Sequence, residues 1–269
     1  MPLNAAQRFE RDVSMHDTKT SKGLVNLVTS QRWIRHSDRL VQERTRDVLT
    51  ARFGHLQHPT VLVIGVGGGG IFGWMFREPG TKRIGVDINH AVLTKARQDH
   101  GPQYFNALEA DAGDLPIADA SVDVLVFDFV LHHLVGQDVL ERALREAARV
   151  TRPGGFIVAR EPSSFSPSGM ILNAANRFRL MHVISGASNY EFALSPPGLL
   201  RSFEQYGSVV DVCGLTYLFA HRLPIWMQNA MAAVDRRLTG GTKLQWVADF
   251  LLYVVQTNAM PENAAAAST

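Results

Sequence analysis

The sequence predicts an α/β fold built on a parallel, doubly wound sheet. The apolar run 61–64 leads directly into the glycine-rich stretch 65–70, which is typical of a buried strand followed by a tight turn. The glycines reach positive φ angles and let another group approach the backbone. Strand and helix patterns then alternate at least four times up to residue 161. That alternation favours parallel strands with helices on both faces of the sheet.

The elements follow from their own patterns. Apolar residues at helical spacing over 24–53, with arginines between them, predict one or two amphipathic helices before the sheet. Further strands are expected at 83–87, 104–110, 122–127 and 156–159. Helices are expected to begin in 71–76, to run from the cap Asn89 to residue 100 and to cover 139–150, and a turn is expected at 152–155.

The alternation stops after residue 162. Residues 162–195 show no clear strand, and we expect them to form a cap over the carboxyl edge of the sheet together with the N-terminal helices. Beyond them the sequence predicts a helix from Pro196, a strand over 208–215, a helix over 223–238 and a strand within 244–256. The expected divisions are a helical arm or lid over 1–58, a ligand-binding α/β core over 59–161, a substrate cap and helix over 162–207, the completion of the sheet over 208–260 and a disordered tail over 261–269.

The composition restricts the function classes. The 269 residues include 46% hydrophobic residues, which supplies a core and argues against disorder. The net charge of +2, without a basic stripe, does not indicate a nucleic-acid binder. The single Cys213 excludes an intramolecular disulfide. No run has membrane-spanning length and no secretory signal begins the chain, so a cytoplasmic location is expected.

The glycine turn and a later acid match a nucleotide-binding pattern. Gly65, Gly67 and Gly70 fit G-x-G-x-x-G, and Asp87 follows Gly65 by 22 residues, at the end of the second predicted strand. An acid at that spacing accepts the hydroxyls of a ribose. This pattern alone leaves an NAD(P)-dependent oxidoreductase open.

A second acid changes the expected ligand. Asp111 ends the third predicted strand as Asp87 ends the second, so the same edge offers one carboxylate for a ribose and one for the exocyclic amine of a purine. After the fourth strand, the bulky residues 127–129 fill the room that a dinucleotide needs. The ligand expected is an adenosine whose far end reaches the glycine turn and the fourth strand.

Taken in order, five segments resemble the class I S-adenosylmethionine-dependent methyltransferases, in particular those of type 11. They are residues 61–70, 85–87, 109–117, 123–134 and 149–155, and the resemblance covers about 55–162. It implies a Rossmann-like sheet of seven strands with the last strand antiparallel. It also implies S-adenosylmethionine as cofactor, bound by residues 59–161, and S-adenosylhomocysteine as product.

The resemblance assigns cofactor contacts residue by residue. They are Gly65, Val66, Gly67 and Gly69 at the methionine part, Asp87 at the ribose, Ile88 at the adenine, Asp111 and Ala112 at the adenine edge, and Asp128 and Phe129 at the sulfonium side. The chain departs from the family at Val63, where an acid is frequent. Either the backbone and Asp128 hold the methionine amino group, or the cofactor binds more weakly.

Three residues are candidates for a catalytic base: His132 and His133 beyond the fourth strand, and Glu161 at the end of the fifth. The alternative is that the histidines pack and cap a helix start and that Glu161 is a structural hydrogen-bond acceptor. Metal binding is not expected, because adjacent histidines cannot both ligate from one helix face.

The expected reaction is methyl transfer to an oxygen or nitrogen of a small or medium-sized, partly hydrophobic acceptor. Aromatic residues at 226, 246 and 250 favour a secondary metabolite in natural product biosynthesis, a lipid-like molecule or a modified peptide. The expected partners are a small-molecule or peptide substrate, with no nucleic acid and no membrane span, in a monomer or homodimer. The alternatives are the NAD(P)-dependent oxidoreductase and a cofactor-binding, non-catalytic partner subunit.

Overall fold

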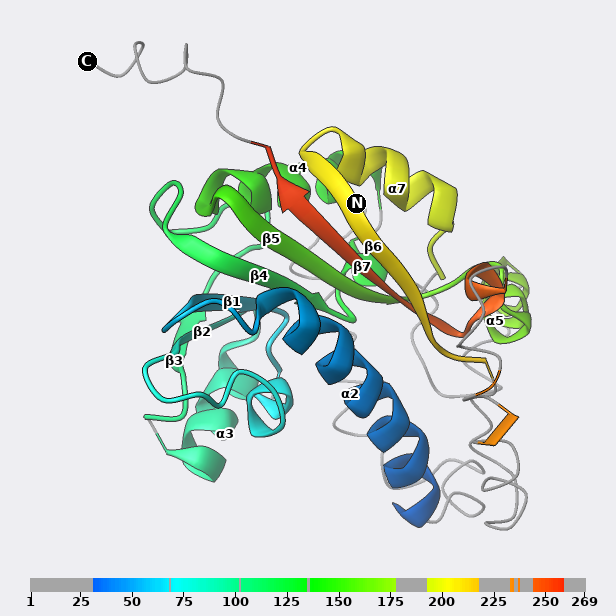
Figure 1. The fold of residues 1–269 in the computed structure, drawn as a ribbon, viewed down its shortest axis with the longest axis horizontal. Helices are drawn as coiled ribbons and strands as arrows, with labels where there is room; N and C mark the ends of the chain where they lie inside the picture. The colour runs from blue at the N-terminus through cyan, green and yellow to red at the C-terminus, as the bar shows by residue number, and fades with distance from the viewer. Residues whose placement is uncertain are drawn as a thin grey trace, which may run out of the picture. The chain divides into compact units, whose positions relative to one another are not determined.

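The computed structural model of the chain contains one seven-stranded sheet in the order β3-β2-β1-β4-β5-β7-β6 (Figure 1). It describes residues 31–67, 69–101, 103–134, 136–177, 193–217, 233–234, 237 and 244–258. The strands are β1 (Thr60–Ile64), β2 (Lys82–Asp87), β3 (Asn106–Glu109), β4 (Val122–Asp128), β5 (Thr151–Pro162), β6 (Gly207–Thr216) and β7 (Phe250–Thr257). The last strand in sequence, β7, is antiparallel, which confirms the predicted fold class.

Four of the five described α-helices lie close to predicted positions, and the fifth, α5 (Pro167–Arg177), has no predicted counterpart. The α-helices are α2 (Gln31–Phe53), α3 (His90–His100), α4 (Gln137–Val150), α5 (Pro167–Arg177) and α7 (Pro196–Glu204). The short 3-10 helices are η1 (Gly70–Gly73), η2 (Leu131–His133) and η3 (Gln245–Val247). The predicted start of the N-terminal helix at residue 24, most of the predicted helix 223–238 and the tail 261–269 lie outside the described residues.

The chain divides into two compact units. We call one the core unit; it comprises Leu56–Arg160, Pro197–Val212 and the described residues from Tyr253 onward. We call the other the second unit; it comprises the described residues up to His55, those of Glu161–Pro196 and those of Cys213–Leu252. All the predicted cofactor contacts belong to the core unit, whereas Glu161 belongs to the second unit.

The centre of the core unit is the parallel pair β1 and β4. Leu62 lies opposite Leu125 and Ile64 opposite Phe127, and these four side chains are at most 2% exposed. Such near-continuous apolar runs are required where helices cover both faces of a parallel sheet. On the other side of β1, β2 pairs with it in parallel, and β3 pairs with β2. The predicted placement of strands two and three on one side of strand one is therefore correct.

Three local predictions differ from the structure. The helix expected from residue 71 is only the 3-10 turn η1, because Phe76 has a φ of 57°, which a continuing helix cannot accommodate. The expected turn at 152–155 lies within β5, where it coincides with a register shift against β4 between Val122 and Val124. The strand expected over 104–110 is shorter, since β3 ends at Glu109, two residues before Asp111.

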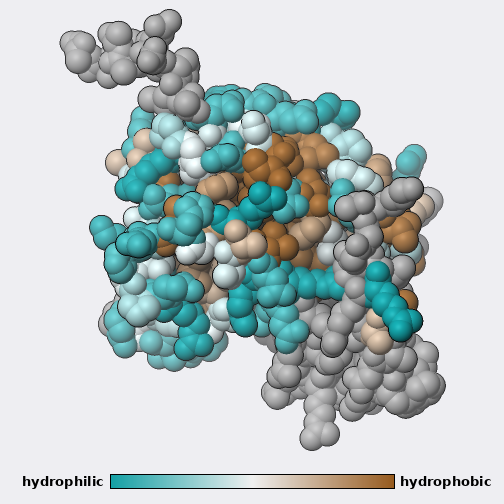
Figure 2. Space-filling view, viewed as in Figure 1, coloured by the Kyte–Doolittle hydropathy of each residue, from teal (hydrophilic) through white to brown (hydrophobic). Residues whose placement is uncertain are grey.

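The surface differs from one end of the sheet to the other. Figure 2 shows hydrophilic residues over the region of α3 and apolar residues gathered on and around β6. On β6, Val209, Val210 and Val212 are only half-buried, and β6 is the edge strand of the sheet. Within the part of the chain that the structure describes, no helix combines the length and apolarity needed to cross a membrane.

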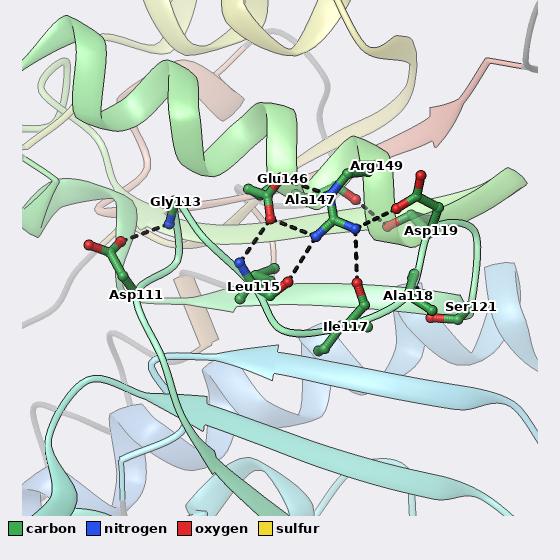
Figure 3. Close-up of polar contacts among 11 residues, drawn as sticks. Asp111, Gly113, Leu115, Ile117, Ala118, Asp119, Ser121, Glu146, Ala147 and Arg149 are labelled. Carbon is green, nitrogen blue, oxygen red and sulfur yellow. Dashed lines mark hydrogen bonds and ion pairs between the residues drawn. The ribbon is translucent and has the colours of Figure 1, made fainter. Parts of the chain in front are cut away.

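One arginine fixes the loop that follows β3. Figure 3 shows Glu146 and Arg149 pointing from α4 toward the loop that carries Leu115 and Ile117. Arg149 donates to the carbonyl oxygens of Ile117 and Leu115, at 2.9 Å each, and to the carboxylates of Glu146 and Asp119. Glu146 also accepts the N–H of Leu115 at 2.8 Å. These bonds hold residues 115–119 of the loop against α4.

The same bonds shift two ionisation equilibria. The hydrogen bond from Arg149 lowers the pKa of Glu146, and the hydrogen bonds to Glu146 and Asp119 raise the pKa of Arg149. A carboxyl whose pKa is lowered in the folded state stabilises the fold at neutral pH and loses that contribution as the pH falls through its pKa. Acid therefore weakens this attachment of the loop.

Arg149→Ala is expected to lower the free energy of unfolding by about 2–3 kcal/mol, since it leaves Glu146 and two carbonyl oxygens without their donor. Urea denaturation at pH 7 measures the change. Lys95→Ala is the control, because Lys95 makes only the exposed ion pair with Asp99, and it should change stability by less than about 0.5 kcal/mol. Equal small effects of both substitutions would show that Arg149 does not anchor the loop.

Candidate functional site

The glycine turn after β1 is built from residues that a side chain would disrupt. Gly65, Gly67 and Gly69 have φ angles of 67°, 51° and 74°, in the left-handed region that favours glycine. A Cβ on Gly65 would lie 1.8 Å from Cγ2 of Val130, and one on Gly69 would lie 2.6 Å from the ring of Phe105. Among the described residues, a Cβ on Gly67 would meet only the carbonyl oxygen of Gly65, at 4.0 Å. The backbone at Gly67 therefore borders open space that can receive a ligand.

Asp87 connects the end of β2 to this turn. Its Oδ2 accepts the N–H of Gly67 and its Oδ1 accepts the N–H of Asn89, each at 2.9 Å. The residue is 8% exposed, and this burial raises the pKa of the carboxyl although the backbone hydrogen bonds oppose the shift. Each carboxylate oxygen keeps a further lone pair. Asp87 can therefore accept two neighbouring hydroxyls while it holds the turn.

Two of the three predicted adenine contacts, Ile88 and Asp111, are exposed. Ile88 is 36% exposed, so it presents an apolar surface next to the carboxylate. Asp111 is exposed and follows β3, and its Oδ1 accepts the N–H of Gly113 at 2.8 Å. That bond orients the Asp111 carboxylate within its own turn. The adenine contacts of Ile88, Asp111 and Ala112 stay predictions.

A charged pair joins the ends of β4 and β5, and only one of its two residues was predicted as part of the site. Asp128 lies opposite Arg160 in the parallel register, and Arg160 Nε donates to Asp128 Oδ1 at 2.8 Å. A second nitrogen of the guanidinium, Nη2, donates to the same oxygen. The guanidinium carbon lies 4.6 Å from the ring centre of Phe129 and 5.3 Å from that of Trp74. The sequence interpretation included Asp128 and Phe129 but missed Arg160.

The backbone at Phe129 is strained. Its φ of 58° is unusual for a residue with a bulky side chain, and such conformations cost about 1–3 kcal/mol. The N–H of Phe129 donates to the carbonyl oxygen of Arg160 at 3.0 Å, which holds the chain in this turn. The strained turn directs the chain after β4 toward Val130, whose side chain lies against Gly65.

The candidate bases lie in different surroundings. His132 is half-buried and His133 exposed, both on η2, with ring centres 4.1 Å apart. Glu161 directly follows Arg160 on β5 and is 1% exposed. Successive residues of a strand point to opposite faces of the sheet, so Glu161 points away from the side of Arg160. The assignment of a base among these three residues stays a prediction.

The edge as a whole fits an adenosyl amino acid. It offers a buried carboxylate on β2, an open glycine turn after β1, and a carboxylate beside a guanidinium on β4 and β5. At about 4.8 Å between neighbouring strands, the distance from β2 to β5 is about 14 Å. Among the described residues, no group of three or more His, Cys, Asp or Glu side chains is arranged to hold a metal ion.

Comparisons with known proteins find methyltransferase relatives. Residues 62–159 match the family described as methyltransferase domain. Malonyl-[acyl-carrier protein] O-methyltransferase from Pectobacterium atrosepticum is 35% identical over 101 residues, which are 37% of this chain and 38% of the relative. The chain therefore matches well under half the length of that curated relative.

Solved structures share the fold at low identity. A Thermotoga maritima S-adenosylmethionine-dependent methyltransferase, described as a possible histamine N-methyltransferase, has a TM-score of 0.57 at 17% identity, over 94% of this chain and 99% of that one. The [4+2]-cyclase SpnF has a TM-score of 0.56 at 16% identity, over 81% of each chain. At such identities the likeness shows the fold alone.

Asp87→Asn is expected to weaken the binding of S-adenosylhomocysteine about 10- to 100-fold, because the anionic acceptor of the ribose hydroxyls is lost. Because an amide has only one acceptor oxygen, the asparagine would keep at most one of the two bonds from the N–H groups of Gly67 and Asn89, and thermal unfolding reports the stability lost with the other. Wild-type binding should also weaken as the pH falls toward the raised pKa of Asp87. Calorimetry and thermal unfolding measure these effects.

The control for this substitution is Asp99→Asn, which removes an exposed carboxylate paired with Lys95 on α3. It should leave the binding of S-adenosylhomocysteine unchanged. If Asp87→Asn bound S-adenosylhomocysteine as tightly as the wild type does, Asp87 would have no role in holding a ribose.

Proposed function

We propose that this protein is an S-adenosylmethionine-dependent methyltransferase, because residues 62–159 match the methyltransferase domain family. The observation that carries the proposal is the buried Asp87, bonded to the N–H of Gly67 beside open space at the glycine turn. The cofactor would supply the methyl group of its sulfonium, which a nucleophile attacks in line as the carbon–sulfur bond breaks and S-adenosylhomocysteine leaves. Asp87 and the turn orient the adenosine, and Asp128 lies on the side where the sulfonium would be held.

For the acceptor, we propose an oxygen nucleophile first and a nitrogen nucleophile second. The Pectobacterium relative is named as an O-methyltransferase, whereas the Thermotoga structure is described as a possible N-methyltransferase. From the sequence we propose a partly hydrophobic acceptor, such as a secondary metabolite, a lipid-like molecule or a modified peptide.

Two other functions remain as alternatives to test. The G-x-G-x-x-G pattern by itself suits an NAD(P)-dependent oxidoreductase. The other alternative is a cofactor-binding, non-catalytic partner subunit.

Calorimetry with S-adenosylhomocysteine and with NAD separates the first two functions. We expect S-adenosylhomocysteine to bind and NAD not to bind, because the bulky residues 127–129 are expected to leave no room for the second nucleotide of a dinucleotide. Tight binding of NAD without binding of S-adenosylhomocysteine would overturn the proposal. Binding of S-adenosylhomocysteine without any labelled methyl transfer to acceptors of the three proposed classes would favour the non-catalytic alternative.

His133→Ala distinguishes the kinds of acceptor. A carboxylate such as that of malonyl-[acyl-carrier protein] is already ionised at pH 7 and needs no base, so its turnover should stay within about threefold of the wild type. A hydroxyl or ammonium acceptor must lose a proton, and its kcat should fall about 10²- to 10⁴-fold. Transfer of a tritiated methyl group measures both rates.

The control for this substitution is His55→Ala, which removes an exposed histidine outside the core unit and should leave both rates unchanged. An unchanged rate for His133→Ala with a hydroxyl or ammonium acceptor would exclude His133 as the base. His132→Ala and Glu161→Gln would then be tested in the same assay.

A further inference from the structure

Arg160 is a buried cation that the proposed function does not yet use. It is 7% exposed at the end of β5, and its side chain contacts three residues of the ligand edge: Asp128, Phe129 and Trp74. Burying a guanidinium is costly unless it is paired and hydrogen-bonded. Burying the charge of Arg160 costs free energy, and the residue lies at the end of a strand where ligands bind. We therefore infer that Arg160 takes part in binding.

The pairing of Arg160 and Asp128 leaves one group on each partner available. Both Nε and Nη2 of Arg160 donate to a single oxygen, Oδ1 of Asp128. Within the described part of the chain, neither Nη1 of Arg160 nor Oδ2 of Asp128 takes part in a hydrogen bond. A guanidinium has five N–H donors, and a carboxylate accepts several bonds. The pair therefore presents a cationic donor and an anionic acceptor side by side.

This pair lies next to the glycine turn. Val130, two residues after Asp128, has its side chain against Gly65, so the chain after β4 packs directly on the turn after β1. Asp87 contacts the same turn from the opposite side, through Gly67. A ligand whose ribose is held at Asp87 and whose chain crosses the turn therefore reaches Asp128 and then Arg160.

We propose that Arg160 and Asp128 together bind the amino-acid end of the cofactor, Arg160 donating to its carboxylate and Asp128 accepting from its ammonium. The inference rests on the proposed function and adds Arg160 to the binding site. An amino acid carries both charges on one carbon, which matches a donor and an acceptor held side by side. It also explains how the chain dispenses with an acid at Val63.

The surroundings suit this role in two further ways. The rings of Phe129 and Trp74 lie within cation–π distance of the guanidinium and limit its orientation, so that Nη1 is held ready for a carboxylate. The ion pair with Asp128 also offsets the positive charge of Arg160. A cationic sulfonium can then bind nearby without strong repulsion.

The test compares two ligands by calorimetry on the full-length chain. S-adenosylhomocysteine has the amino-acid end, whereas 5′-methylthioadenosine has the adenosine and sulfur but lacks that end. Arg160→Gln should weaken S-adenosylhomocysteine about 10- to 100-fold, the loss expected for a hydrogen bond to a charged group, and change 5′-methylthioadenosine less than about threefold. Arg160→Lys, which keeps the buried charge, should give a smaller loss for S-adenosylhomocysteine only.

The matched control is Arg152→Gln. Arg152 is on the same strand and pairs with Asp123 of β4 at 2.5 Å, but at the opposite end of the two strands. It should leave the affinity for both ligands unchanged. Equal losses for the two ligands in both Arg160 variants would show that Arg160 only supports the fold. Unchanged affinity for S-adenosylhomocysteine would show that Arg160 does not meet the amino-acid end.

A failure of the proposed function would look different. If the wild-type chain bound neither S-adenosylhomocysteine nor 5′-methylthioadenosine, the proposed function would be wrong. The role of Arg160 and Asp128 in binding the cofactor would then be excluded as well. If the wild type bound both ligands with equal affinity, the amino-acid end would contribute nothing, and only the role given to Arg160 and Asp128 would be overturned.

Discussion

The hydrogen bond from the Gly67 N–H to Asp87 is the contact on which the ligand edge depends, because it joins the end of β2 to the turn after β1. The turn can take its shape only with glycines, since Gly65 is closed off by Val130 and Gly69 by Phe105. One carboxylate thus shapes the turn and keeps lone pairs for a ribose. The raised pKa of Asp87 reflects the burial that this double role requires.

Charged pairs join β4 and β5 at both ends, but the two pairs differ in burial. Arg152 is half exposed where it meets Asp123, and such a pair contributes little free energy. Arg160 and Asp128 have side chains only 9% and 17% exposed. Removing one partner there leaves a buried charge, at a cost of about 3–5 kcal/mol. The pair whose disruption costs more free energy therefore lies at the ligand end of the sheet. This is expected of a binding site rather than of a pair that only joins the two strands.

Much of this arrangement could be predicted from the sequence. The apolar runs of β1 and β4, the acid Asp87 and the cap Asn89 are local signals, and each predicted its element correctly. Arg160 could not be identified in this way, because its partner Asp128 is defined only by the register of two strands 32 residues apart. A basic residue after one parallel strand and an acid after its neighbour would have been the signal. The helix expected after the glycine turn failed because Phe76 adopts a positive φ.

The central claim is that one adenosyl amino acid lies across the ends of β2, β1, β4 and β5. A crystal structure of the protein with S-adenosylhomocysteine tests it most directly. We predict the ribose hydroxyls on Asp87, the thioether chain over Gly67, and the amino-acid end between Asp128 and Arg160. A ligand that lies elsewhere, or whose amino-acid end points away from Arg160 while the ribose stays on Asp87, would contradict this arrangement.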